Sequence, residues 1–217
     1  MTPPLTDPLR RVVARARRRR SGSRDALERV YATEYDPYHS IDNDYEATKY
    51  ADVLRVVEGH RSSRGLEVGC AVGQFTEQLA AVCDELVAID ISAQAVERTR
   101  ERVAELPNVR VLRGTAPDEL PPGPFDLVVC SDVLYYLPAR RLRRALDQLS
   151  SLLAPGGALV SLHWLGDFGA PTSGDQVHDQ QAERWRSLQH VSSDLRAGVG
   201  PDGAGYRLDR YDRPRAG

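Results

Sequence analysis

The stretch "GLEVGCAVGQFTEQLA", residues 65–80, places a carboxylate and two glycines where an apolar segment changes into a helical pattern. Glu67 lies in the apolar segment, and Gly69 and Gly73 follow it at the bend. Glycine allows a tight turn and lets backbone approach a ligand closely, while the first N–H groups of a helix have no partner within that helix. We therefore expect a ligand at this bend.

A second carboxylate, Asp90, ends the apolar segment "ELVAID", 23 positions after Glu67. A carboxylate about twenty residues beyond a glycine turn, at the tip of the next strand, accepts hydrogen bonds from the two hydroxyls of a ribose. The spacing therefore predicts a ligand that contains a nucleoside.

The glycine spacing argues against one class of nucleoside ligand. Dinucleotide sites use the pattern G-x-G-x-x-G, in which the middle glycine admits the pyrophosphate. Here Ala71 stands in the middle position, where the pattern requires glycine. A nicotinamide-dependent oxidoreductase is therefore a disfavoured alternative.

The elements that must position these residues follow from an alternation of apolar runs and helical periodicity. The predicted strands are "LEVG", "ELVAID", "VRVLRG", "FDLVVCSD" and "GALVSLHW", with amphipathic helices between them. This alternation predicts an α/β fold of the doubly wound, Rossmann-like kind, with a mostly parallel sheet. Beyond Trp164 we expect a loop, a helix over "QVHDQQAERWRSL" and an antiparallel pair of edge strands, "HVSSDL" and "YRLDRYDR".

Length and composition predict one domain that follows a basic arm. The chain has 217 residues, of which 41% are hydrophobic, enough for one full core. Residues 1–24 contain the run "RRVVARARRRR" and are expected to form a disordered or loosely helical arm. Residues 25–217 are expected to form a single domain, with a helical flap over 25–60, a cofactor-binding core over 65–164, and a substrate loop, helix and edge strands over 165–217.

The composition of the arm also indicates which binding partners and which cellular location to expect. Its arginines suggest an RNA-binding alternative, but no aromatic residues stand among them to stack on bases, so a nucleic-acid partner is not expected. The arm lacks the apolar core of a signal peptide, and no later stretch approaches the roughly 18 apolar residues that cross a bilayer. We expect a cytoplasmic protein without membrane contact, and no sequence signal indicates its oligomeric state.

The pattern E-x-G-C-x-x-G-x-F, from Glu67 to Phe75, resembles motif I of the class I S-adenosylmethionine-dependent methyltransferases. The segment "FDLVVCSDVLYYLP" is similar to their fourth-strand motif, and "LLAPGGALVSLHW" is similar to their helix, proline-glycine-glycine turn and fifth strand. The similar segments follow one another in the expected order from Leu66 to Trp164. The resemblance implies an enzyme that uses S-adenosyl-L-methionine.

A narrower resemblance lies in the flanking segments. "DPYHSIDNDYEATKYADVL" before motif I and "HWLGDFGAPTSGDQVHD" after the fifth strand are similar to the NodS-like family of nodulation-type N-methyltransferases. The type member of that family methylates a freed amino group on the terminal glucosamine of a chitooligosaccharide. The resemblance implies a small-molecule acceptor, an amino sugar or glycoside, and a tyrosine-rich flap that covers the ligand. The long arginine-rich arm departs from the family.

The methyltransferase resemblance assigns cofactor roles. It implies that Glu67 holds the methionine ammonium, that Asp90 binds the ribose, and that Ile91 packs on the adenine. An acidic residue at the adenine amino group is absent from positions 115 and 116. The cofactor-binding residues implied are Glu67, Gly69, Cys70, Gly73, Asp90, Ile91, Thr115, Ala116, Ser131 and Tyr136.

The acceptor side is expected to combine aromatic walls with groups that orient an amine. The substrate-binding residues expected are Tyr38, Tyr45, Tyr135 and Trp164. His163, His178 and Asp132 are the catalytic candidates, because a histidine tuned near neutrality can take a proton from the amine during in-line transfer. No His, Cys and Asp cluster has the spacing of a metal site, so no metal is expected.

Two other acceptor classes stay open. A histidine base would equally serve an O-methyltransferase acting on a sugar or phenol hydroxyl. An RNA-modifying methyltransferase would use the arginine-rich arm to bind phosphates, although "SDVLYY" stands where such enzymes carry an N-P-P-Y-type motif.

Overall fold

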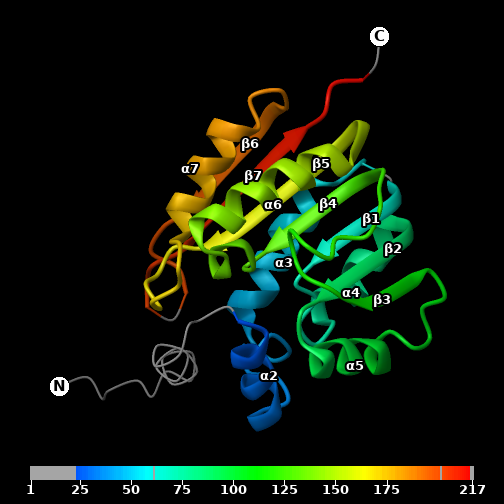
Figure 1. The fold of residues 1–217 in the computed structure, drawn as a ribbon, viewed down its shortest axis with the longest axis vertical. Coiled ribbons are helices and arrows are strands. Elements are labelled where there is room, and N and C mark those ends of the chain that lie inside the picture. The colour runs from blue at the N-terminus through cyan, green and yellow to red at the C-terminus, as the bar shows by residue number, and fades with distance from the viewer. Residues whose placement is uncertain (1–22, 61, 201, 216–217) are drawn as a thin grey trace.

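The described part of the chain, residues 23–60, 62–200 and 202–215 of a computed structural model, forms one seven-stranded sheet with helices on both faces (Figure 1). The basic arm predicted over residues 1–24 lies outside the described residues except for its last two positions, Ser23 and Arg24. No helix in the described ranges is both long enough and apolar enough to cross a membrane.

The sheet has the strand order β3-β2-β1-β4-β5-β7-β6. The strands are β1 (Ser62–Val68), β2 (Cys83–Asp90), β3 (Val109–Arg113), β4 (Phe125–Ser131), β5 (Leu153–Trp164), β6 (Gln189–Arg196) and β7 (Tyr206–Asp212). The first five strands pair in parallel, whereas β7 pairs antiparallel with both β5 and β6. The α/β fold, the parallel core and the antiparallel edge pair are confirmed.

The helices are α2 (Arg24–Thr33), α3 (Asp44–Val56), α4 (Gln74–Leu79), α5 (Ala93–Arg102), α6 (Ala139–Leu152) and α7 (Gly174–Arg184), with short 3-10 turns η1 (Ala80–Val82) and η2 (Leu134–Tyr136). One apolar core packs α6 and α7 on the sheet, and another packs α3 and α4 on its opposite face. In the view of Figure 1, α6 and α7 lie in front of the sheet. The two cores exclude water from both faces of the parallel strands, which explains their continuous apolar sequences.

Side-chain caps define where several helices begin. Asn43 caps α3 by accepting a hydrogen bond from Tyr45 N (2.9 Å), and Ser92 caps α5 by accepting one from Ala95 N (3.3 Å). Each cap satisfies an N–H group that the first turn of a helix leaves without a partner. The caps therefore set the positions from which α3 and α5 approach the carboxyl ends of the strands.

One strand boundary differs from the prediction. We expected the fifth strand to begin at Gly157, after a turn made by Pro155 and the two following glycines, but β5 begins at Leu153. Leu153 pairs with Phe125, and the register shifts before Leu127 pairs with Ala158. The strand therefore absorbs the Pro-Gly-Gly segment as an irregularity, because burial of Leu153 against β4 favours extended backbone immediately after α6.

Candidate active site

A cavity lies at the point of the sheet where the strand order reverses. The second and third strands continue from β1 to one side, while β4 and β5 continue to the other. Open α/β sheets bind ligands outside the carboxyl ends of their strands at such a switch point. The cavity is lined there by the glycine turn after β1, by the tips of β2 and β4, by Trp164 at the end of β5, and by residues of α2, α3 and the segment between them.

The backbone of the glycine turn adopts a conformation that disfavours residues other than glycine. Gly69 has φ of 87°, and a Cβ atom at this position would lie 2.8 Å from Val133 Cγ2. Gly73 has φ of 80°, and a Cβ atom there would lie 2.9 Å from Thr99 Cγ2. Both the left-handed conformation and the close packing therefore select glycine. The turn lets backbone form part of the cavity wall beside Cys70.

Asp90 sits at the tip of β2 with its carboxylate fixed by backbone. Its Oδ2 accepts a hydrogen bond from Ala71 N (3.2 Å), and its Oδ1 accepts one from Ser92 N (2.9 Å). Burial raises the pKa of Asp90 to about 6, although the N–H groups of Ser92 and Ala71 oppose that rise. A carboxylate held in this way on a cavity wall suits a partner that donates two hydrogen bonds.

Glu67 is the second buried carboxylate of the cavity. Its Oε2 accepts a hydrogen bond from Thr76 Oγ1 (2.6 Å). Burial raises the pKa of Glu67 to about 7; the negative charge of Asp90 adds to this rise and the Thr76 hydrogen bond opposes it. Because desolvation makes its negative charge costly, a cationic ligand group beside Glu67 would be stabilised.

Gly73, which was also predicted to bind the cofactor, is not part of the cavity lining, whereas the other predicted cofactor residues reach the cavity. The lining includes Ile91, Thr115, Ala116, Ser131 and Tyr136.

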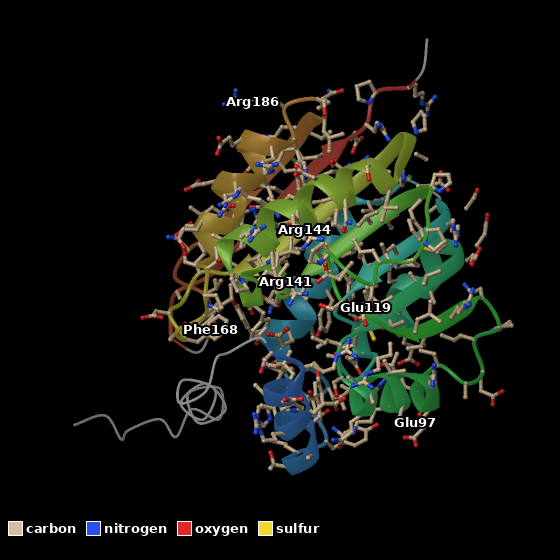
Figure 2. The ribbon with its side chains drawn as sticks, in the orientation of Figure 1. Glu97, Glu119, Arg141, Arg144, Phe168 and Arg186 are labelled. Carbon is tan, nitrogen blue, oxygen red and sulfur yellow. The ribbon has the colours of Figure 1, made fainter. Side chains whose placement is uncertain are left out.

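Asp118, the nearest acidic residue to the predicted adenine loop, is directed elsewhere. Its carboxylate pairs with Arg141 (2.9 Å) and Arg144 (3.1 Å), which project from α6 (Figure 2). Asp118 is not part of the cavity lining. An acidic contact to an adenine amino group is therefore not available from this residue.

The predicted acceptor residues converge on the same cavity. Its lining includes Tyr38, Tyr45, Tyr135, Trp164 and Asp132.

Asp132 is held firmly at the end of β4. It has a φ of 50°, its N–H donates to Leu162 O (2.8 Å), and its Oδ1 accepts a hydrogen bond from Trp164 N (2.7 Å). Backbone of β5 therefore fixes the Asp132 carboxylate on the cavity wall.

The two predicted histidines do not reach the cavity. His163 and His178 are fully buried, and neither belongs to the cavity lining. His163 lies near the end of the predicted strand, now β5, and His178 lies in the predicted helix, now α7, but both rings are buried in the packed core and not exposed at the carboxyl edge of the sheet. The prediction that either ring contacts the acceptor as a base therefore gains no support from the lining of this cavity.

The hydrogen bonds of the two rings explain their burial. Leu134 N donates to His163 Nε2 (3.2 Å), so a neutral His163 ring carries its hydrogen on Nδ1, which lies 3.4 Å from His178 Nε2. His178 Nδ1 in turn lies 2.6 Å from Asp209 Oδ2. Burial, followed by the charges of His178 and Lys49, holds the pKa of His163 well below its usual value. The chain of hydrogen bonds ends on a backbone amide, which provides no route for a proton into the cavity.

The sequence analysis missed Glu46 and Lys49 on α3. Both line the cavity, and the Lys49 side chain is almost fully buried. Its Nζ lies 2.6 Å from Glu46 Oε1 and forms an ion pair with Asp132 Oδ2. Lys49 is the only lysine among the 29 lysine and arginine residues of the chain, but this count does not by itself indicate a role in the site.

Metal ligands are not assembled in the described ranges. No group of three or more His, Cys, Asp or Glu side chains there is arranged to hold a metal ion.

Comparison with known proteins identifies the family. Residues 19–166, more than half of the chain, match the family model described as Nodulation protein S (NodS). Nodulation protein S of Bradyrhizobium diazoefficiens is 35% identical over 162 residues, which cover 73% of this chain and 70% of the relative. That of Sinorhizobium fredii is 37% identical over 136 residues, and the match spans 62% of each chain, less than two thirds of the relative.

Solved structures agree with this assignment. The crystal structure of the N-methyltransferase NodS from Bradyrhizobium japonicum WM9, in complex with S-adenosyl-L-homocysteine, superimposes with a TM-score of 0.78. The two chains are 30% identical, and the match covers 88% of this chain and 98% of the other. The [4+2]-cyclase SpnF, at 18% identity and a TM-score of 0.61, shares the fold. The chain therefore belongs to the NodS family of S-adenosylmethionine-dependent methyltransferases with the class I fold.

Proposed function

We propose that this enzyme transfers a methyl group to the nitrogen of a small amine, with an amino sugar as the preferred acceptor class. The observation that carries the proposal is that the buried carboxylates Glu67 and Asp90 share one cavity with Asp132 and a set of aromatic side chains. Membership of the NodS family supports the choice of nitrogen, because the solved relative is described as an N-methyltransferase.

The cavity residues fit the cofactor. When bound, S-adenosylmethionine supplies a methyl group that a sulfonium already activates. In our proposal Asp90 accepts hydrogen bonds from the ribose hydroxyls, and Glu67 balances the charge of the methionine ammonium. Gly69 leaves room for a ligand close to the backbone, and Ile91 and Ala116 supply apolar surface for the base.

The chain itself then needs mainly to orient the acceptor. Correct alignment of two reacting groups can contribute about 7 to 11 kcal/mol to lowering a barrier. Tyr38, Tyr45 and Tyr135 offer flat faces that suit the C–H surfaces of a sugar ring, and the fixed carboxylate of Asp132 can accept a hydrogen bond from the amine. The two buried histidines contribute by holding Leu134, next to Tyr135, in place.

The cavity lining favours an amine over a hydroxyl acceptor. The carboxylates on the wall, Glu46, Glu67, Asp90 and Asp132, stabilise a cationic amine, whereas a neutral hydroxyl gains little from their charge. No histidine lies on the wall that the described residues form, so the histidine base expected for O-methylation is missing there. O-methylation of a sugar or phenol is therefore the weaker reading of this site.

The proposal is tested by following labelled methyl groups. Purified enzyme and labelled S-adenosylmethionine are incubated with amino sugars, deacetylated chitooligosaccharides, phenols and RNA. Asp90→Ala serves as the variant without cofactor binding, and Glu97→Ala, on the exposed side of α5 (Figure 2), serves as the surface control. We expect label on an amine with the wild type and with Glu97→Ala only. Label confined to hydroxyls or RNA would overturn the proposed acceptor class.

A further inference from the structure

The ion cluster of Glu46, Lys49 and Asp132 joins the helix α3 to the end of β4 inside the cavity. Glu46 and Lys49 stand one helical turn apart, so both project to the same side of α3. Asp132 comes from the opposite wall, where backbone of Trp164 holds its other carboxylate oxygen (2.7 Å). Three charged groups are thus gathered where little water reaches them.

The lysine of this cluster is neither a base nor a nucleophile. Burial opposes its charge, but the carboxylates of Asp132 and Glu46 raise the pKa of Lys49 above its usual value. Lys49 therefore remains an ammonium, and an ammonium has no lone pair with which to attack a methyl group. Its two carboxylate partners explain how a methyltransferase can carry an amine in its own cavity without using it as the acceptor.

The charges of the cavity do not balance. Within the described lining, four carboxylates, Glu46, Glu67, Asp90 and Asp132, face a single cationic side chain, Lys49. Glu67 and Asp90 serve the cofactor in our proposed function, which leaves two carboxylates around one ammonium on the acceptor side. Burial, and then the charge of Asp132, raise the pKa of Glu46, although Lys49 opposes the rise. A second cation beside this cluster would therefore be stabilised.

A hydroxyl beside the cluster also lacks a partner. Tyr45 Oη is buried and makes no hydrogen bond within the described structure, although the Tyr45 ring lines the cavity and lies 5.1 Å from Lys49 Nζ. A buried hydroxyl without a partner costs free energy, and a small movement of the Tyr45 ring would bring this hydroxyl to a polar group of the acceptor.

We propose that Glu46 and Asp132 receive the acceptor as an ammonium, and that Lys49 positions these two carboxylates. This inference rests on the proposed function and narrows it, because it requires an acceptor with a cationic amine and not a hydroxyl. The amine of a deacetylated amino sugar is such a group, and the Tyr45 hydroxyl then pairs with a neighbouring polar group of the same acceptor.

In this proposal, proton transfer precedes methyl transfer. Glu46 takes one proton from the ammonium, which leaves a neutral amine with a lone pair and a protonated Glu46. The lone pair forms the new N–C bond while the C–S bond of the methyl donor breaks, so its electron pair stays on sulfur. Positive charge moves to the nitrogen, where the Asp132 carboxylate stabilises it. Glu46 afterwards gives its proton to water.

The single lysine provides a direct test on the wild-type enzyme. Protein produced with ¹⁵N-labelled lysine has one Nζ resonance, from Lys49. With S-adenosyl-L-homocysteine saturating, we expect an amino sugar to shift this resonance, and the matching sugar with a hydroxyl in place of the amine to leave it unchanged. Equal shifts with both compounds, or no shift with the amino sugar that the enzyme methylates, would overturn the inference.

Variants separate this inference from the proposed function. We expect Glu46→Gln and Asp132→Asn to lower kcat/KM for the amine about 100-fold or more, with affinity for S-adenosyl-L-homocysteine unchanged within about threefold. Glu46→Gln should also displace the pH profile of kcat. Glu58→Gln, an exposed carboxylate just beyond α3, is the matched control. Amine methylation that survives in both variants overturns the cation site alone, whereas methylation of hydroxyls by the wild type overturns the proposed function as well.

Discussion

The two buried carboxylates of the cavity couple ligand binding to pH. Burial raises the pKa of Glu67 to about 7 and that of Asp90 to about 6. At pH values below these pKa values, both groups are protonated. Glu67 then has no negative charge with which to bind an ammonium, and Asp90 is a weaker hydrogen-bond acceptor for two hydroxyls. The ionised forms therefore bind the cofactor better than the protonated forms.

We predict that affinity for S-adenosyl-L-homocysteine rises as the pH increases from about 5.5 to 8. Ionisation of Asp90 contributes first and ionisation of Glu67 second, because their pKa values lie near 6 and 7. Isothermal titration calorimetry across this range measures the effect. Glu67→Gln should retain only the lower step, and a binding constant that does not change between pH 5.5 and 8 would contradict the prediction.

The glycine turn permits a second prediction about a single residue. Gly69→Ala should destabilise the protein and weaken cofactor binding, because it combines a strained φ with a contact of 2.8 Å to Val133. Gly59→Ala is a matched control, since Gly59 has a similar φ of 77° but nothing within 4 Å of the added Cβ atom. We expect a cost of about 1 to 2 kcal/mol from the conformation alone, and about 1 to 3 kcal/mol more from the contact. Chemical denaturation measures both values, and equal losses would show that the contact with Val133 does not matter.

Among the helices, α2 is joined to the start of α5 by the Glu28 carboxylate, and Arg98 of α5 adds a hydrogen bond to Tyr31 O (2.8 Å). Glu28 accepts hydrogen bonds from Ser92 Oγ (2.7 Å) and Ala93 N (2.8 Å) and pairs with Arg113 (2.8 Å). A carboxylate at a helix N-terminus is stabilised by the free N–H groups there. In Figure 1, α2 lies beside α5 at one end of the molecule. Glu28 therefore holds one wall of the cavity next to Asp90.

Replacing Glu28 should loosen this wall without unfolding the core. We expect Glu28→Ala to increase amide hydrogen exchange within α2 about 5- to 30-fold, which corresponds to a local loss of about 1 to 2 kcal/mol. Exchange in the central strands should be unchanged. Arg29→Ala, on the exposed side of the same helix, is the control. Equal protection of α2 in the wild type and Glu28→Ala would show that other contacts hold the helix.

The elements were largely predictable, whereas part of the site was not. The parallel strands are buried on both faces, so their apolar runs stand out in the sequence, and Asp90 and the glycine turn follow from local spacing. The pairing of Lys49 with Asp132 depends on the packing of α3 against the end of β4, which no local pattern encodes. His163 was misjudged because its place near the end of β5 suggested an exposed tip, although the strand continues to pair with β7 through Trp164.

At the scale of the whole molecule, buried titratable groups make stability depend on pH in opposite directions. Burial, with the charges of His178 and Lys49, lowers the pKa of His163 in the folded protein, while an unfolded histidine takes up a proton near about pH 6.5. The stability that His163 contributes is therefore present above about pH 6.5 and is lost as the pH falls. Glu67 has a raised pKa, so its contribution is present at low pH and is lost as the pH rises from about 4.5 through 7.

Two variants should separate these opposing effects. We measure the free energy of unfolding without cofactor between pH 4.5 and 8.5, and compare the dependence on pH because each substitution also changes packing. Relative to the wild type, His163→Gln should become more stable as the pH falls below about 6.5, since no buried imidazole is then left to protonate. Glu67→Gln should become relatively more stable as the pH rises toward 7 and above, since no buried carboxylate is then left to ionise. The exposed variant Glu97→Gln should follow the wild type, and difference curves that slope in the same direction for the two buried variants would contradict this account of stability.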